Sequence, residues 1–219
     1  MHGAKIMVYG KAGTGKTRLL ASAPSPIILS AEQGLLSLRG FNLPVWQIKT
    51  MQDLVEAYMA ILKDPKFKQF KSVGIDSTSE IAEVLLNAEM KKTTNGQRAY
   101  GETQNKMTEI FRNFRDIPGL NVIFLAKEEF TTDAASGAKA YGPSFPGGKL
   151  SQQSPYLVDE LFQLVNFGKN AEGVEQRFLR TQPDNQHQAK DRSGALLEWE
   201  NADPATGGGL TAIFQKMVG

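Results

Sequence analysis

The chain has 219 residues, of which 41% are hydrophobic and 22% are charged, so we expect one globular domain spanning residues 1–219. It contains no cysteine, which excludes disulfides and thiolate metal sites and favours a reducing, cytoplasmic location. The net charge of +2 is too small to indicate a nucleic-acid-binding protein, so any such contact must come from local patches. The apolar run near the start is too short for a signal peptide or membrane anchor, and no membrane partner is expected.

The first predicted elements are a strand at Lys5–Tyr9 and a helix at Thr17–Ala23. The segment that joins them, Gly10–Thr17, matches the phosphate-binding loop G-x-x-x-x-G-K-[ST] at every required position. Its glycines let backbone N–H groups converge on one phosphate, and the following helix points its positive end at the same anion. Lys16 can reach the β- and γ-phosphates, and the Thr17 hydroxyl can ligate Mg²⁺. We therefore predict that ATP and Mg²⁺ bind at Gly10, Lys11, Ala12, Gly13, Thr14, Gly15, Lys16, Thr17 and Arg18.

Strands and helices alternate along the rest of the chain, which predicts an α/β fold with a mostly parallel sheet covered on both faces. Alternating residues around Leu161, Gln163 and Val165, and again at Arg177–Arg180, predict antiparallel strands that close one side of the sheet. Two long polar or glycine-rich loops are expected, at Lys91–Glu102 and Glu129–Gly148. The other predicted strands are Pro26–Ser30, Val45–Ile48, Ser72–Asp76 and Asn121–Ala126, and the other predicted helices follow Thr50, contain Ile81 and Leu85, or contain Met107 and Phe111.

Two carboxylates follow predicted strands and are candidates for the chemistry of phosphoryl transfer. Asp76 ends the strand SVGID, where an acid can hold Mg²⁺ through water; the alternative is a helix N-cap. Glu32 follows the strand after the phosphate-loop helix, where it can face the γ-phosphate and polarise the attacking water. The alternative for Glu32 is a surface cap.

The order of these motifs resembles the RecA-like ATPase core, and most closely the compact phage-encoded RecA-like proteins of the Sak type, which act in single-strand annealing and recombination. The resemblance implies a three-layer RecA-like P-loop fold with a mostly parallel central sheet and antiparallel C-terminal strands. It assigns Glu32 as the general base and Lys16 as a catalytic contact to phosphate. It also places Lys127, at the end of NVIFLA, where relatives often have a Gln or His that senses the γ-phosphate.

The same resemblance implies two mobile loops that hold single-stranded DNA. Both predicted loops combine cations with aromatic residues, a mixture that follows a phosphate backbone and stacks on bases. Exposed lysines are, alternatively, often only solvated. The candidate DNA-binding residues are Lys91, Lys92, Arg98 and Tyr100 in the first loop and Lys139, Tyr141, Phe145 and Lys149 in the second.

The segment Ala189–Gly194 resembles the K-x-R finger of RecA-like hexameric helicases. Cations at a hairpin tip can reach the γ-phosphate held by a neighbouring subunit, so Lys190 and Arg192 are candidate catalytic residues in trans within a ring or filament. A surface turn with a salt bridge through Asp191 is the alternative. Because a core strand begins at Lys5, we expect no separate N-terminal polymerisation element.

These features predict an ATP-hydrolysing phage recombination protein that binds single-stranded DNA and promotes annealing or strand pairing as a homo-oligomer in the cytoplasm of the bacterial host. A single-strand-binding protein is a further candidate partner. Two other functions stay open. One is a small-molecule phosphotransferase, although no compact arginine cluster suggests the lid of such kinases. The other is a nucleotide-gated binding module with little turnover.

Overall fold

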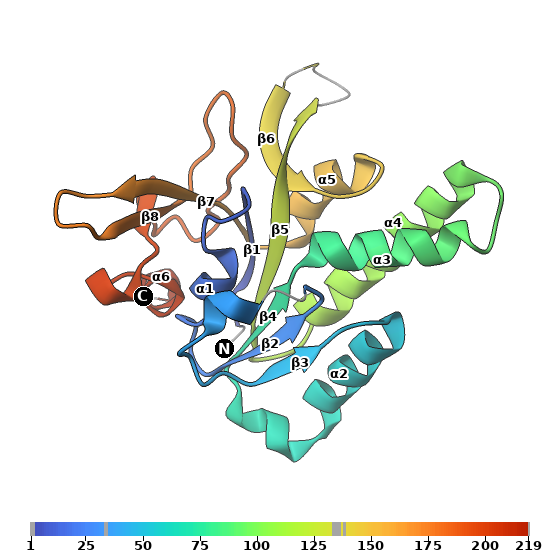
Figure 1. Cartoon of the computed structure of the whole chain (residues 1–219), viewed down its shortest axis with the longest axis horizontal. Helices are drawn as coiled ribbons and strands as arrows, with labels where there is room; N and C mark the ends of the chain where they lie inside the picture. Colours follow the sequence, from blue (N-terminus) through green and yellow to red (C-terminus); the bar gives the residue numbers. More distant parts are fainter. Residues whose placement is uncertain (1–2, 33–34, 133–136, 138, 219) are drawn as a thin grey trace.

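A mostly parallel β-sheet separates two layers of helices in the computed structural model of the chain, which describes residues 3–32, 35–132, 137 and 139–218 (Figure 1). The strands are β1 (Lys5–Gly10), β2 (Pro26–Ser30), β3 (Val45–Gln47), β4 (Ser72–Asp76), β5 (Asn121–Thr132), β6 (Lys139–Ser144), β7 (Glu160–Lys169), β8 (Glu175–Arg180) and β9 (Trp199–Asn201). The α-helices are α1 (Lys16–Leu20), α2 (Met51–Lys63), α3 (Thr78–Met90), α4 (Gly96–Arg115), α5 (Lys149–Gln153) and α6 (Leu210–Val218). Short 3₁₀ helices lie at Leu35–Leu38, Pro65–Gln69, Ser154–Leu157 and Pro204–Thr206.

The strand order across the sheet is β3-β2-β4-β5-β1-β7-β8-β9, with β6 paired to the far end of β5. The strands β3, β2, β4, β5, β1 and β7 are parallel neighbours, whereas β8 pairs antiparallel with both β7 and β9, and β6 pairs antiparallel with β5. The predicted α/β fold class is therefore confirmed. The antiparallel strands predicted at Leu161–Val165 and Arg177–Arg180 are confirmed, because β7 and β8 pair antiparallel with each other; on its other side β7 pairs in parallel with β1. Alternation along a strand shows which residues share a face, but the connection before the strand sets its direction.

Two apolar cores lie on the two faces of this sheet. Successive residues of β1 point to opposite faces, so Met7 and Tyr9 enter one core while Ile6 and Val8 enter the other. The first core packs against α2, α3 and α4, and the second packs against α1 and α6. The buried strand β1 and the first half of β5, as far as Ala126, separate these layers, which explains why both stretches are almost entirely apolar.

Close packing between α1 and β4 positions the phosphate loop. A Cβ atom at Gly74 would lie 2.7 Å from both terminal methyl carbons of Leu20, so only glycine lets this helix approach the strand so closely. Because α1 begins at Lys16 and β4 ends at Asp76, this contact brings the loop beside the carboxyl end of β4.

Both predicted loops are more ordered than the sequence suggested. The side chain of Asn95 accepts a hydrogen bond from the Arg98 backbone N–H at 3.1 Å and starts α4 at Gly96, so the first loop shrinks to the connection at 91–95. The second is a hairpin, because β5 continues to Thr132 and returns as β6. Residues 133–136 and 138 of that predicted loop lie outside the described residues.

Several short elements gave no clear sequence signal. These are β6, β9, α5 and the 3₁₀ helices, whose few residues show little periodicity. The prediction also missed α6, although its apolar residues recur at helical spacing, at Leu210, Ile213, Phe214 and Met217. By contrast, the predicted cap at Thr50 is confirmed, since Thr50 and Asp53 form a reciprocal capping box at the start of α2. None of the helices in the described part of the chain combines the length and apolar character needed to cross a bilayer.

Candidate functional site

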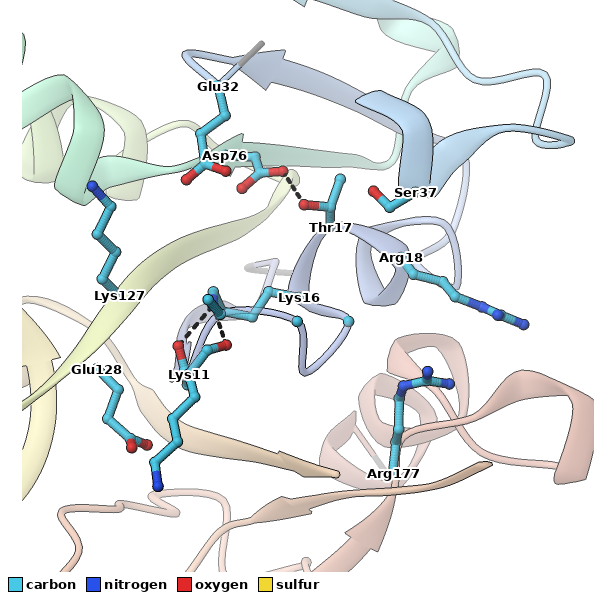
Figure 2. A pocket seen from close by; sticks show the side chains of 14 residues that line it. Lys11, Lys16, Thr17, Arg18, Glu32, Ser37, Asp76, Lys127, Glu128 and Arg177 are labelled. Carbon is cyan, nitrogen blue, oxygen red and sulfur yellow. Dashed lines mark hydrogen bonds between the residues drawn. The ribbon is translucent and has the colours of Figure 1, made fainter. Parts of the chain in front are cut away.

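A cavity of about 700 Å³ opens at the carboxyl ends of β1, β2 and β4, beside the middle of β5 (Figure 2). The phosphate loop forms its floor, and Glu32 and Asp76 face it from the ends of β2 and β4. The register of the parallel strands explains this convergence, because Ser30 pairs with Asp76 and Gly10 pairs with Lys127. Residues predicted from separate motifs therefore meet in one pocket.

The phosphate loop has the backbone that its glycines predict. Gly13 and Gly15 have φ angles of 79° and 98°, a region that residues with a Cβ rarely adopt. The loop folds around Lys16, whose Nζ donates to the carbonyl oxygens of Gly10 at 2.7 Å and Lys11 at 2.9 Å. Burial lowers the pKa of Lys16, while Glu32 and Asp76 oppose that shift. A cation enclosed by a loop of this shape suits a polyphosphate.

Thr17 and Asp76 provide the oxygen atoms that Mg²⁺ prefers. The Thr17 hydroxyl donates to Asp76 Oδ2 at 2.5 Å, and Asp76 is 3% exposed. Burial raises the pKa of Asp76 to about 6; the Thr17 hydrogen bond opposes this shift and Glu32 adds to it. A hydroxyl and a carboxylate at the edge of a phosphate-binding cavity fit a magnesium ion that also binds phosphate oxygens.

Glu32 is held in a defined orientation beside Asp76. The Ser77 hydroxyl donates to Glu32 Oε1 at 2.8 Å, and the backbone N–H of Ala31 donates to the Asp76 carbonyl at 2.7 Å. Among the residues that the structure describes, no side chain donates a hydrogen bond to the second carboxylate oxygen of Glu32. A carboxylate fixed through one oxygen can accept a proton through the other, which is the arrangement a general base requires.

Lys127 lies on the rim of the cavity, opposite Glu32 in Figure 2. Its ammonium forms an ion pair with Glu80 at 2.9 Å, which raises the pKa of Lys127, and its backbone N–H donates to Ser79 Oγ. The structure places Lys127 beside the nucleotide cavity, and its role as a γ-phosphate sensor stays a prediction.

Sequence reasoning missed Arg177, which β8 brings to the same cavity. Arg177 Nε donates to the Thr14 carbonyl at 3.1 Å, and a Cβ at Gly15 would lie 2.9 Å from that nitrogen. Its side chain is 15% exposed and paired with Glu175. Figure 2 shows its guanidinium turned toward Arg18 across one end of the pocket. An isolated arginine in a strand of mixed polarity has no local signature, so only the fold reveals this contact.

The predicted DNA-binding residues occupy two neighbouring parts of the molecule. Tyr100 of α4 packs on the backbone at Gly147, since a Cβ there would lie 2.9 Å from the Tyr100 ring. This contact joins the start of α4 to the segment that precedes α5. The other exposed candidates lie on these elements or their flanks, at Lys91, Lys92, Arg98, Lys139 and Lys149.

Phe145 does not belong to the exposed set. It is 3% exposed and packs edge-on against Phe111 with ring centroids 5.7 Å apart. The sequence suggested an aromatic residue in a mobile loop, but β6 ends at Ser144 and carries Phe145 into the core. Phe145 is therefore a core residue, and its assignment as a base-stacking residue was wrong.

Lys190 and Arg192 lie beside the amino end of β7, whereas the phosphate loop lies at the carboxyl end of β1. Lys190 pairs through its backbone with Leu161 near the start of β7, and its Nζ donates to the carbonyls of Pro155 and Val158 at 2.6 Å each. Arg192 contacts Asp159 at 3.2 Å and is 66% exposed. The segment is thus not the predicted hairpin tip. From the amino end of the strands, the two cations could contact only a nucleotide held by another subunit. That role stays a prediction.

Comparison with known proteins agrees with this geometry. A family model described as "AAA domain" matches residues 2–193. The chain belongs to this AAA-domain family of P-loop proteins. No curated protein sequence matches it. Among solved structures, a KaiC-like protein, PH0186, from the hyperthermophilic archaeon Pyrococcus horikoshii OT3 aligns with a TM-score of 0.45 and 16% identity, over 86% of this chain and 83% of that one.

Proposed function

We propose that the chain is a Mg²⁺-dependent ATPase in which Glu32 is the general base. The observation that supports this best is the position of Glu32, fixed by Ser77 beside the Thr17–Asp76 pair and above Lys16, within one cavity. Thr17 and Asp76 would hold the ion, which when bound neutralises charge on the phosphate oxygens. A carboxylate placed here favours activation of water.

The residues divide the hydrolytic step between them. Glu32 takes a proton from a water molecule as the water oxygen bonds to the γ-phosphorus. The bond from that phosphorus to its bridging oxygen breaks, and ADP leaves with the electron pair. Lys16 and the N–H groups of the phosphate loop stabilise the negative charge that develops. Ser77 keeps the Glu32 carboxylate oriented during the transfer.

We further propose that this ATPase acts in phage recombination, binds single-stranded DNA and promotes annealing or strand pairing as an oligomer. The contact between Tyr100 and Gly147 supports the DNA-binding part, because it unites two segments that each contain cations. The exposure of Arg192 supports the proposal of an oligomer, since an exposed cation at the amino end of the strands is available to a neighbouring subunit.

An ATPase assay with and without single-stranded DNA tests the proposal. Stimulation by DNA is the expected result. Transfer of phosphate to a small acceptor would instead indicate a phosphotransferase, and tight ATP binding without turnover would indicate a nucleotide-gated binding module. Either of those results contradicts the proposed function.

The DNA-binding segments are tested through the salt dependence of binding. Neutralising Lys91, Lys92 and Arg98 should weaken binding to an oligonucleotide and flatten the log–log salt slope by about 0.7 for each lost phosphate contact. Lys63, which ends α2, and Lys66 and Lys68 of the following 3₁₀ helix are exposed and provide a control with the same change in charge. An equal effect of both triple variants would show that only net charge matters.

Mixing two inactive variants tests the trans role. Arg192→Ala should bind ATP but lose turnover, and Glu32→Gln should bind ATP and hydrolyse it slowly. If Arg192 acts on a neighbour, mixed oligomers contain interfaces with an intact Glu32 and an intact Arg192, so activity should partly return. Failure to recover activity at every mixing ratio would exclude action in trans, and full activity of Arg192→Ala alone would exclude any catalytic role.

A further inference from the structure

A second cavity, of about 380 Å³, lies next to the nucleotide pocket. Strands β7 and β8 form its base, and β6 forms one wall together with the segment at 186–188, which pairs with Tyr141 through backbone hydrogen bonds. Figure 1 shows β6 and the β7–β8 pair on either side of the phosphate loop. We call this cavity the β7–β8 cleft and define it by Lys11, Tyr141, Gln163, Arg180, His187 and Trp199.

Unpaired polar atoms lie on the base of the β7–β8 cleft. Gln163 and Arg180 are directly opposite each other in the β7–β8 ladder, so their side chains share one face. Gln163 is 5% exposed and donates to Glu128 at 2.8 Å, but its Oε1 atom has no partner among the described residues. Arg180 binds Asp184 through Nη1 at 2.7 Å, while its Nε is likewise unpaired.

These two atoms are one acceptor and one donor. Folded proteins leave few buried polar atoms unpaired, so each needs an explanation. Neither atom is exposed to bulk water, so a ligand would reach them after rotation of the two side chains. A flat molecule with a donor and an acceptor along one edge would satisfy both atoms together.

Aromatic rings and cations line the rest of the cleft. Tyr141 stacks on His187 with ring centroids 5.2 Å apart and an angle of 17° between the planes. The Arg180 guanidinium lies 4.3 Å from the centre of the Trp199 ring, and Lys11 Nζ lies 5.9 Å from that of Tyr141. Aromatic and guanidinium planes bind the faces of flat π-systems, and a lysine at the rim suits a phosphate.

We propose that the β7–β8 cleft is a second ligand site, which binds one nucleobase carried either by a free nucleotide or by single-stranded nucleic acid. The base would lie among Tyr141, His187 and Trp199, with its polar edge toward Gln163 and Arg180 and its phosphate near Lys11. This site adjoins the hydrolytic pocket, and the inference does not depend on the annealing activity.

The two cavities share residues, so an occupant of the cleft should influence ATP hydrolysis. Lys11 and Glu128 line both cavities, and Glu128 accepts the hydrogen bond from Gln163. A base that rotates Gln163 would therefore disturb a carboxylate beside the phosphate loop. Binding in the cleft should thus change the rate of turnover.

Trp199 provides a direct reporter. Trp46 is the only other tryptophan, so Trp46→Phe leaves a single fluorophore that lines the cleft. With the nucleotide pocket filled by a non-hydrolysable ATP analogue and Mg²⁺, we would titrate this protein with thymidine monophosphate and, separately, with oligothymidylate. Saturable quenching by the mononucleotide would indicate a free nucleotide as ligand, and quenching by the oligomer alone would indicate a strand.

Variants show whether quenching comes from the cleft. Tyr141→Ser and His187→Ala, made in the Trp46→Phe protein, should each weaken binding by roughly tenfold, because each removes part of the stacking surface. Tyr156→Ser is the matched control, since Tyr156 is 85% exposed and does not line the cleft. Circular dichroism and the melting temperature would confirm that each variant folds.

Three results would overturn the inference: no quenching by either ligand, quenching that both cleft variants leave unchanged, or an equal loss in Tyr156→Ser. The outcome is separable from that of the proposed function. DNA-stimulated ATPase activity with no response of Trp199 would refute the cleft alone. A Trp199 response without DNA stimulation would refute the DNA-dependent ATPase and leave the cleft supported.

Discussion

The two ends of the central strands both contain a buried carboxylate, yet they differ in what that carboxylate faces. At the carboxyl end, Asp76 borders a cavity of about 700 Å³ together with Lys16 and Glu32. At the amino end, Glu160 is 1% exposed and accepts hydrogen bonds from the backbone N–H groups of Arg192 at 2.9 Å and Ser193 at 3.2 Å. Burial raises the pKa of both groups, to about 6 for Asp76 and about 7 for Glu160.

A shifted pKa alone therefore does not identify a functional site. At the cavity end, polar groups remain able to bind a ligand. At the amino end, Glu160 of β7 instead accepts hydrogen bonds from Arg192 and Ser193, and so attaches the segment that contains Lys190 to β7. Substitution of the carboxylates at the first end should change activity, and substitution of Glu160 at the second should change mainly stability. The following experiments test that division, beginning with the largest expected effect.

Lys16→Ala should abolish nucleotide turnover and leave the fold intact. Within the described part of the chain, the Lys16 ammonium donates hydrogen bonds only to carbonyl oxygens of the phosphate loop, so the apolar cores lose nothing when it is removed. Steady-state ATP hydrolysis and a thermal melt would be measured together. Normal hydrolysis by the folded variant would show that the phosphate loop is not the active site.

Glu32→Gln should retain ATP and Mg²⁺ but slow hydrolysis by roughly a hundredfold or more, because the amide cannot accept the proton from water. Asp76→Asn should instead raise the Mg²⁺ concentration needed for activity. Single-turnover rates over a range of Mg²⁺ concentrations distinguish the two. If the effects are exchanged, the roles of these carboxylates are reversed.

Arg177→Ala should raise the KM for ATP by about tenfold, which corresponds to about 1.4 kcal/mol of binding free energy. The guanidinium holds the Thr14 carbonyl and borders the nucleotide cavity, so its loss should loosen the phosphate loop. Lys169→Ala, an exposed change at the end of β7, is the control. An unchanged KM in Arg177→Ala would limit Arg177 to packing.

Glu160→Gln should alter the pH dependence of stability and leave ATP turnover unchanged. The pKa of Glu160 is raised in the folded state, so the folded protein binds more protons than the unfolded chain between about pH 4.5 and pH 7. The free energy of unfolding of the parent should thus fall as pH rises through that range, by on the order of 1–2 kcal/mol from this group.

Urea unfolding of both proteins at pH 5, 6, 7 and 8 measures this difference, and the same proteins are assayed for hydrolysis at pH 8. Asp76 contributes a shift in the same direction to both proteins, so it cancels in the comparison. Parallel pH profiles would contradict the account of Glu160. A large loss of activity would contradict the assignment of Glu160 to stability.

The sequence alone determined the phosphate loop, the alternating α/β order and the two strand-end carboxylates Glu32 and Asp76. These features depend on contiguous residues, whose glycine conformations, periodicity and helix caps are local properties. For that reason the loop geometry at Gly13 and Gly15 and the capping box at Thr50 could be anticipated.

Tertiary structure decided the contacts between distant segments. Arg177 reaches Thr14 across 163 residues of chain, Ser77 orients Glu32 from the start of α3, and Phe145 is buried because the hairpin returns it to the core. The direction of β7 and the attachment of Lys190 likewise depend on which strand lies next to which. Side-chain packing between elements selects such contacts, and no local pattern encodes them.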